Sequence, residues 1–180
     1  MMDYSDILNI PPYYLCSVEK RRLLTERLIA LSKAHYVACV DYQRMVDALG
    51  CNLEQVADYY DLPFLPVSLF KELDLLSVGK KEVFKTMLSS GTTGQAVSKI
   101  YLDRATAGNQ QKTLVKIVSN FTGSARMPML IIDSPSVVKD RAMFSARGAG
   151  ILGFSIFGAD KAYALDDNMN IDLKGIESFL

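Results

Sequence analysis

The chain has 180 residues, of which 49% are hydrophobic, so it is long enough to bury an apolar core of about one domain. Its 20 basic and 20 acidic residues give a formal net charge of zero. This balance provides no electrostatic footprint for nucleic acid or for an acidic membrane surface, and we expect no nucleic-acid partner.

The N-terminal residues, MMDYSDILNI, contain early acids and no basic stretch before an apolar run, so we expect no secretory signal here. Uninterrupted apolar runs stay far below the roughly 20 residues that a membrane helix needs. We therefore expect a cytoplasmic protein without a membrane span. The three cysteines, Cys16, Cys39 and Cys51, lack CxxC spacing, so we expect reduced and mostly buried thiols, and no metal site.

The first third of the chain has a helical pattern. Ser17 is predicted to cap a helix with Glu19 in its first turn, and apolar residues at helical spacing extend the pattern to a stop at Gly50. A short helix is then predicted over residues 52–60, and a helical or 3₁₀ segment over residues 67–76. The single histidine, at position 35, falls in the long helix, where we expect it to be packed or half-exposed.

Beyond Gly79, strand and helix patterns alternate, which favours an α/β layer. The predicted strands cover residues 83–88, 97–102, 128–133, 154–157 and 161–165, and the predicted helices cover residues 104–121 and 170–180. Asp103 is expected to cap the first of these helices, and Asn170 or Asp172 the second. The apolar run 128–133 is typical of a strand covered on both faces.

The fold class that follows is α/β, with a helical region over residues 1–80 and a mixed sheet with flanking helices over residues 81–180. The last helix ends on Phe179 and Leu180, although helices usually close on a polar or glycine terminator. We therefore expect residues 1–180 to be one incomplete, truncated domain. A homodimer would cover its exposed apolar edge.

One loop stands out between the predicted strands 83–88 and 97–102. It is longer than the usual two to about five residues of a hairpin loop, and it contains no large apolar side chain. Glycine lets the backbone approach an anion closely, and hydroxyls add donors without bulk. A polyphosphate ligand would use both, whereas the plainer alternative is a surface loop. The residues concerned are Ser89, Ser90, Gly91, Thr92, Thr93 and Gly94.

Four segments of the chain resemble the N-terminal part of the LuxE-type acyl-protein synthetases, within the adenylate-forming ligase superfamily. These segments are YYLCSVEKRRLLTERLIALSKAHY, DLPFLPVSLFKELDLLSV, MLSSGTTGQAVSKIYLD and SARGAGILGFSIFG. The resemblance implies the N-terminal portion of an adenylate-forming ligase fold. It also implies a fatty-acid ligase that uses ATP and Mg²⁺, and an acyl-protein reductase as a possible partner subunit.

The implied reaction has two steps. A fatty carboxylate attacks the α-phosphate of ATP to give acyl-AMP and pyrophosphate, and a protein cysteine then accepts the acyl group. By this resemblance, residues 89–94 form the phosphate cradle. Lys99 is a further candidate, although the superfamily often places x-Pro-Lys after the glycine and this chain has Gln95-Ala96-Val97. Lys99 therefore either contacts a phosphate or faces solvent as an alternating strand residue.

The acceptor cysteine and the late catalytic lysine of the family are expected outside this chain, so we expect the chain alone to be inactive and name no catalytic residue. Two alternatives stay open. One is an aryl- or acyl-CoA ligase of the phenylacetate–CoA type, which has a similar loop. The other is a non-catalytic partner subunit that keeps the loop as a vestige.

A second glycine-rich stretch, residues 148–153, fits GxGxxG. A Rossmann site needs a strand directly before the motif and a helix opening from it, and the sequence predicts neither here. In the family reading, Arg147, Gly148 and Gly150 would instead form a tight turn near the acyl site, with Arg147 close to an anion. Neither Ser145 nor Ser155 has a GxSxG elbow, so a serine hydrolase is not supported.

Overall fold

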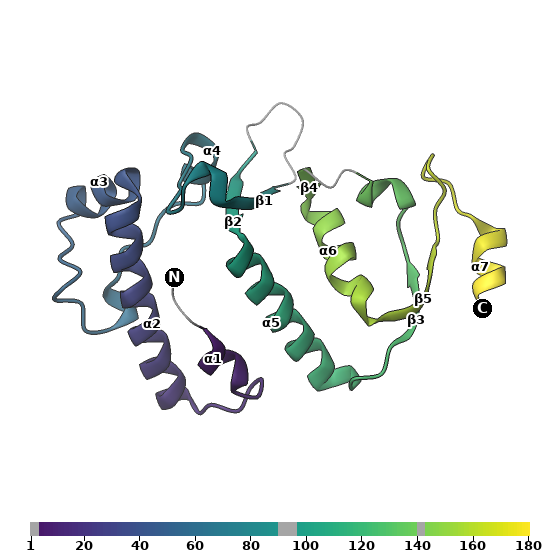
Figure 1. The fold of residues 1–180 in the computed structure, drawn as a ribbon, viewed down its shortest axis with the longest axis horizontal. Coiled ribbons are helices and arrows are strands. Elements are labelled where there is room, and N and C mark those ends of the chain that lie inside the picture. Colours follow the sequence, from purple (N-terminus) through teal and green to yellow (C-terminus); the bar gives the residue numbers. More distant parts are fainter. Residues whose placement is uncertain (1–3, 90–96, 140–142) are drawn as a thin grey trace.

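The computed structural model describes residues 4–89, 97–139 and 143–180. Its elements form an extended row, with the N-terminal helices at one end, two small sheets along the middle and the C-terminal helix at the other end (Figure 1). The observed class is mixed α/β, as predicted.

The N-terminal region consists of α1 (Ser5–Asn9), α2 (Ser17–Ala38) and α3 (Val40–Ala48). The predicted cap at Ser17 is wrong, because Cys16 occupies the N-cap position and its backbone N–H donates to Glu19 Oε2 at 3.2 Å. The predicted stop at Gly50 is confirmed by its φ of 64°, which favours glycine. A break at the buried Cys39, which separates α2 from α3, was not predicted.

The predicted helix over residues 52–60 is wrong. Side chains bond to nearby backbone there and compete with a helical ladder. Asn52 Oδ1 accepts the Glu54 N–H at 3.0 Å, and Asp58 Oδ1 accepts the Tyr60 N–H at 3.1 Å. Only the 3₁₀ turn η1 (Tyr59–Asp61) forms, and the segment predicted over residues 67–76 contains the short α4 (Leu69–Glu72).

The first sheet has the order β2-β1-β4. The 3₁₀ turn η2 (Lys80–Glu82) leads into β1 (Val83–Leu88), which pairs antiparallel with β2 (Lys99–Asp103) and parallel with β4 (Met143–Ser145). The predicted hairpin and the mixed sheet are confirmed. In this register Leu88, the last residue of β1, lies opposite Ser145, the last residue of β4.

The second sheet pairs β3 (Met127–Ile131) in parallel with β5 (Gly158–Tyr163). Both strands were predicted, within a few residues of these bounds. The prediction that the run 128–133 is covered on both faces is wrong, because Pro128 is exposed, Met129 and Leu130 are half-buried, and Ile132 after the strand is 83% exposed. The 3₁₀ turn η3 (Pro135–Val138) follows.

The predicted strand over residues 154–157 is also wrong. Its first residue ends α6 (Ala146–Phe154), and the remainder forms the 3₁₀ turn η4 (Ser155–Phe157). The Ser155 hydroxyl donates to the Leu152 carbonyl at 2.8 Å, which continues the helical turn. Local hydrogen bonding therefore overrides the aromatic, strand-like composition.

Two other helices complete the described chain. In α5 (Arg104–Thr122), Asp103 Oδ1 accepts the Thr106 N–H at 2.7 Å, which confirms the predicted cap. In α7 (Leu173–Phe179), Asp172 rather than Asn170 is the cap, and its Oδ1 accepts the Gly175 N–H at 2.9 Å.

Within the described residues the buried apolar core is small and spread along the molecule. It comprises Cys39, Val46, Leu53, Leu102, Ile131 and Ala164. Large apolar side chains are exposed, including Phe64 at 90%, and the homodimer that would cover such surface remains a prediction. Among the helices of the described residues, none has both the length and the apolar character to cross a membrane.

Candidate functional site

The first residue of the predicted phosphate loop, Ser89, is bonded to Ser98, the residue just before β2. The Ser89 N–H donates to the Ser98 carbonyl at 3.1 Å, and the Ser98 N–H donates to the Ser89 hydroxyl at 2.9 Å. Ser98 is buried. The Ser89 hydroxyl is the acceptor in the second of these bonds, so that bond does not use its proton. The other predicted cradle residues, Ser90, Gly91, Thr92, Thr93 and Gly94, lie outside the described residues.

Lys99 and Tyr101 share a carboxylate on one face of β2. Lys99 Nζ lies 3.6 Å from Asp74 Oδ1, and the Tyr101 hydroxyl donates to the same oxygen at 2.6 Å. The hydrogen bond to Asp74, together with partial burial, raises the pKa of Tyr101 to about 12. The same bond and the nearby Lys99 lower the pKa of Asp74. Lys99 is therefore directed toward Asp74 in this structure, and a phosphate contact from it remains a prediction.

Arg147, Gly148 and Gly150 lie in the first turns of α6, directly after β4. The predicted tight turn is thus wrong, because this stretch is helical. The reason for rejecting a Rossmann site also changes, because the strand β4 does precede the glycine motif and the helix α6 does form there. The glycines, however, lie inside that helix and not in a turn before it, as a phosphate loop would need.

The third glycine of the motif has a packing role. A Cβ atom at Gly153 would lie 3.0 Å from Leu114 Cδ2 of α5, which is tighter than ordinary side-chain contact. Beside it, Gln111 Nε2 of α5 donates to the Gly153 carbonyl at 3.2 Å. The glycine therefore allows α5 and α6 to approach closely.

The sequence did not single out Asp133, which follows β3 of the second sheet and pairs with Arg147 in the first turn of α6, directly after β4 of the first sheet. Its side chain is only 5% exposed, and Oδ2 lies 2.9 Å from Arg147 Nε. Asp133 Oδ1 accepts the Ser134 N–H at 2.8 Å. The sequence signal that could have identified Asp133 is its position, directly after an apolar strand and before the turn residues Ser134-Pro135.

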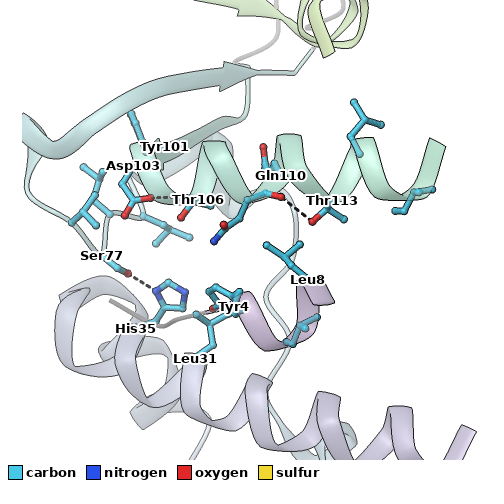
Figure 2. A pocket seen from close by; sticks show the side chains of 17 residues that line it. Tyr4, Leu8, Leu31, His35, Ser77, Tyr101, Asp103, Thr106, Gln110 and Thr113 are labelled. Atoms are coloured by element: carbon cyan, nitrogen blue, oxygen red, sulfur yellow. Dashed lines mark hydrogen bonds between the residues drawn. The ribbon is translucent and has the colours of Figure 1, made fainter. Parts of the chain in front are cut away.

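A separate cavity of about 670 Å³ lies between the N-terminal helices and α5 (Figure 2). Leu31 and His35 of α2 contribute to one side, and Thr106, Gln110 and Thr113 of α5 line the other. Further lining residues are Tyr4, Ile7, Leu8, Leu75, Leu76, Ser77, Val78, Tyr101, Asp103, Asn109, Leu114 and Ile117. Apolar side chains predominate in this lining, with polar groups from both sides interspersed.

His35 is the titratable group of this cavity that burial affects most clearly. Its Nδ1 lies 2.6 Å from the Ser77 hydroxyl, and partial burial lowers its pKa. The expectation of a packed or half-exposed helical histidine is confirmed. In the described residues no carboxylate pairs with this ring, so the histidine and serine do not form a triad.

The three thiols differ in exposure: Cys39 is buried, Cys51 is half-buried and Cys16 is exposed. The expectation of mostly buried thiols is therefore wrong for Cys16. Within residues 4–89, 97–139 and 143–180, no three His, Cys, Asp or Glu side chains gather in a way that could hold a metal ion.

Comparison with known proteins gives a family match over almost the whole chain. The family model described as "Acyl-protein synthetase, LuxE" matches residues 2–177. A curated relative, the long-chain-fatty-acid–luciferin-component ligase of Vibrio harveyi, is 37% identical over 79 residues. That alignment covers 43% of this chain but only 21% of the relative. No solved structure matches the chain.

Proposed function

The chain belongs to the LuxE family of acyl-protein synthetases, and we propose that it supplies the ATP phosphate-binding part of a ligase that activates a long-chain fatty acid. The observation that carries the proposal is the position of the SSGTTG segment. It begins at the carboxyl end of β1, beside the parallel strand β4, and its first residue, Ser89, is joined by two hydrogen bonds to Ser98, just before β2. Ligands of α/β sheets bind at this edge.

The donor set of the loop suits the phosphates of ATP. Ser89 offers a hydroxyl proton at the first position of the segment, and the residues that follow add three hydroxyls and two glycines. Mg²⁺ usually binds through substrate phosphates, water and one or two carboxylates. We therefore assign no described residue as its ligand and expect it to arrive with the nucleotide.

The proposed chemistry is carboxylate activation. A fatty carboxylate attacks the α-phosphate of ATP, the bond to the β-phosphate breaks, and pyrophosphate leaves while acyl-AMP forms. Such a step depends on positioning and on neutralising the charge of the leaving group. The role of the loop would be to hold the β- and γ-phosphates. A protein cysteine would accept the acyl group next, with an acyl-protein reductase as the partner that consumes it.

Two alternatives make different predictions for the acceptor and for nucleotide binding. A CoA ligase of the phenylacetate–CoA type would form the same adenylate but pass the acyl group to coenzyme A. A non-catalytic subunit with a vestigial loop would bind neither ATP nor pyrophosphate. The family match favours the protein thiol over coenzyme A, since the family is one of acyl-protein synthetases.

The test is calorimetric titration of this chain with Mg-ATP and with magnesium pyrophosphate. The loop variant carries Thr92→Val and Thr93→Val, which remove two hydroxyls and keep the side-chain shape. The control is Thr122→Val on exposed α5 surface, which removes a hydroxyl far along the chain from the loop. We expect the loop variant to lose binding about tenfold or more and the control to bind as the wild type does.

Each outcome decides between the readings. Loss in the loop variant alone supports the phosphate cradle. Binding that the loop variant keeps would refute the role of the loop. Absence of binding by the wild-type chain would mean either that the remainder of the ligase is needed or that the loop is vestigial, and the same titration on the full-length gene product would separate these two.

A further inference from the structure

The start of the phosphate loop and the start of α6 leave the first sheet side by side. Leu88 of β1 lies opposite Ser145 of β4 in a parallel register, so Ser89 and the first turn of α6 follow at the same edge. Figure 1 shows the end of β1, the beginning of α6 and η3 along this one edge of the molecule. Any anion that the loop holds would therefore lie close to the first turn of α6.

Asp133 reaches this edge from the second sheet, and its backbone is held on both sides. Its N–H donates to the Ile131 carbonyl at 2.9 Å, and its carbonyl accepts the Leu165 N–H at 3.1 Å. The side chain is 5% exposed, with one oxygen bonded to the Ser134 N–H and the other to Arg147 Nε. The carboxylate thus has a fixed position and presents one oxygen to the arginine.

Among the described residues, Asp133 is the carboxylate that holds Arg147. Its contact with Asp133 is through Nε, at 2.9 Å, while 62% of its side chain is exposed. No second carboxylate pairs with it in the part of the chain that the structure describes. A guanidinium has five N–H donors, so several remain for a ligand, in the fork geometry that carboxylate and phosphate groups accept.

The energetics do not favour a purely stabilising pair. Burying a carboxylate costs free energy that a single contact to a largely exposed arginine repays poorly. The same arrangement does serve orientation, because a buried acid with a bond on each oxygen restricts the rotamers of a long side chain. Second groups that hold a binding residue in place in this way are common at functional sites.

We infer that the Arg147 guanidinium binds an oxyanion of the substrate at the edge where the loop begins, and that Asp133 positions it. The ligand group is a fatty carboxylate or a phosphate of ATP, both of which offer two oxygens to the fork. Arg147 touches the ligand and Asp133 acts through it. The inference rests on the proposed function only for the identity of the substrate, since the geometry of the pair is independent of the loop.

The test uses the wild-type chain and four variants, with two probes followed by calorimetry: magnesium pyrophosphate, and decanoate below its micelle concentration. Arg147→Met removes the guanidinium, and Arg147→Lys keeps the charge without the fork. Asp133→Asn removes the orienting charge. The control is Lys139→Met, because Lys139 is a cation of equal exposure, 62%, that pairs with Asp167 close to the same edge.

We expect Arg147→Met to weaken one probe about tenfold or more and Arg147→Lys to recover only part of that loss. Lys139→Met should change neither probe. Loss of pyrophosphate would identify the phosphate as the ligand group, and loss of decanoate the carboxylate. Both results support the inference.

The role of Asp133 is tested by a double-mutant cycle. Asp133→Asn should weaken the same probe in the wild-type background and have no further effect in the Arg147→Met background, because its influence passes through the arginine. A merely structural acid would lower the melting temperature in both backgrounds and leave the affinity of the folded protein unchanged. If Asp133→Asn does not fold, the two Arg147 variants still decide whether the arginine binds an anion.

Failure of the inference and failure of the proposed function give different results. If the Thr92→Val, Thr93→Val variant loses pyrophosphate while both Arg147 variants bind both probes normally, the inference is wrong and the proposed function stands. If Arg147→Met loses a probe while the loop variant binds pyrophosphate normally, the proposed function fails and the inference stands. Binding of neither probe, by this chain and by the full-length gene product, would overturn both.

Discussion

Replacing Asp103 by alanine should destabilise the protein measurably, because this residue joins β2 to α5. Its Oδ1 accepts the Thr106 N–H at 2.7 Å, with extended backbone at φ −75° and ψ 171°, as an N-cap requires. Loss of an aspartate cap costs about 1 kcal/mol, within a range of about 0.5–2. For a chain of this length that lowers the melting temperature by about 2–4 °C.

Asp103→Asn is the matched control, since asparagine keeps the accepting oxygen and loses only the charge at the helix N-terminus. Its cost should be smaller, about 0.3–1 kcal/mol, and should fall with added salt. Hydrogen bonds from Thr106 lower the pKa of the Asp103 carboxyl. Its stabilising effect is therefore present above the unfolded-state pKa and is lost as the pH falls through the lower, folded-state pKa.

The assay is urea unfolding followed by far-UV circular dichroism, at neutral pH and near pH 3. We expect the gap between wild type and Asp103→Asn to shrink at the lower pH, while Asp103→Ala stays less stable than both. Equal stabilities for the alanine and asparagine variants at neutral pH would refute the argument, because the hydrogen bond would then contribute nothing.

Three further predictions concern the surroundings of the cavity and the cysteines. Tyr101, with its pKa raised to about 12, should ionise late in an ultraviolet absorbance titration. The Asp74→Asn variant should bring this ionisation back toward pH 10, and ionisation of Tyr101 near pH 10 in the wild type would contradict the prediction. Because burial lowers the pKa of His35, protonation of this side chain opposes folding, so the stability should fall as the pH drops below about 6.5. The His35→Gln variant should reduce this dependence of the urea unfolding midpoint on pH. An unchanged dependence would mean that other groups cause it. Ellman's reagent should react quickly with the exposed Cys16 and should react with the buried Cys39 only on unfolding. The Cys16→Ser variant should therefore lack the fast phase of the reaction. A fast phase that persists in this variant would show that another thiol is more accessible than in the structure.

Local signals in the sequence were sufficient for several elements. The hairpin β1–β2, the α5 cap at Asp103 and the left-handed stop at Gly50 each depend on residues close together in the chain, and each was predicted. The loop between the strands was recognised in the same way, from glycines and hydroxyls whose chemistry suits an anion. The family resemblance rested on the same short segments and is confirmed.

Local signals failed where side chains compete with the backbone or where composition is ambiguous. Asn52 and Asp58 accept backbone N–H groups two residues on, which replaces the predicted helix by turns. The aromatic run after Gly153 resembles a strand in composition but forms the last residue of α6 and the 3₁₀ turn η4. Helix and strand patterns of only four or five residues cannot be told apart by periodicity alone.

The sequence by itself determined the class of this protein, its family and the loop that we propose as the phosphate cradle. Only the tertiary structure placed β4 in parallel beside β1, and so brought the first turn of α6 to the edge where the loop begins. The same holds for Asp133 and Arg147, which are 14 positions apart and come from the ends of strands in different sheets. Such a pairing depends on strand order and register. Packing between segments distant in the chain sets both, and local sequence patterns do not reveal them.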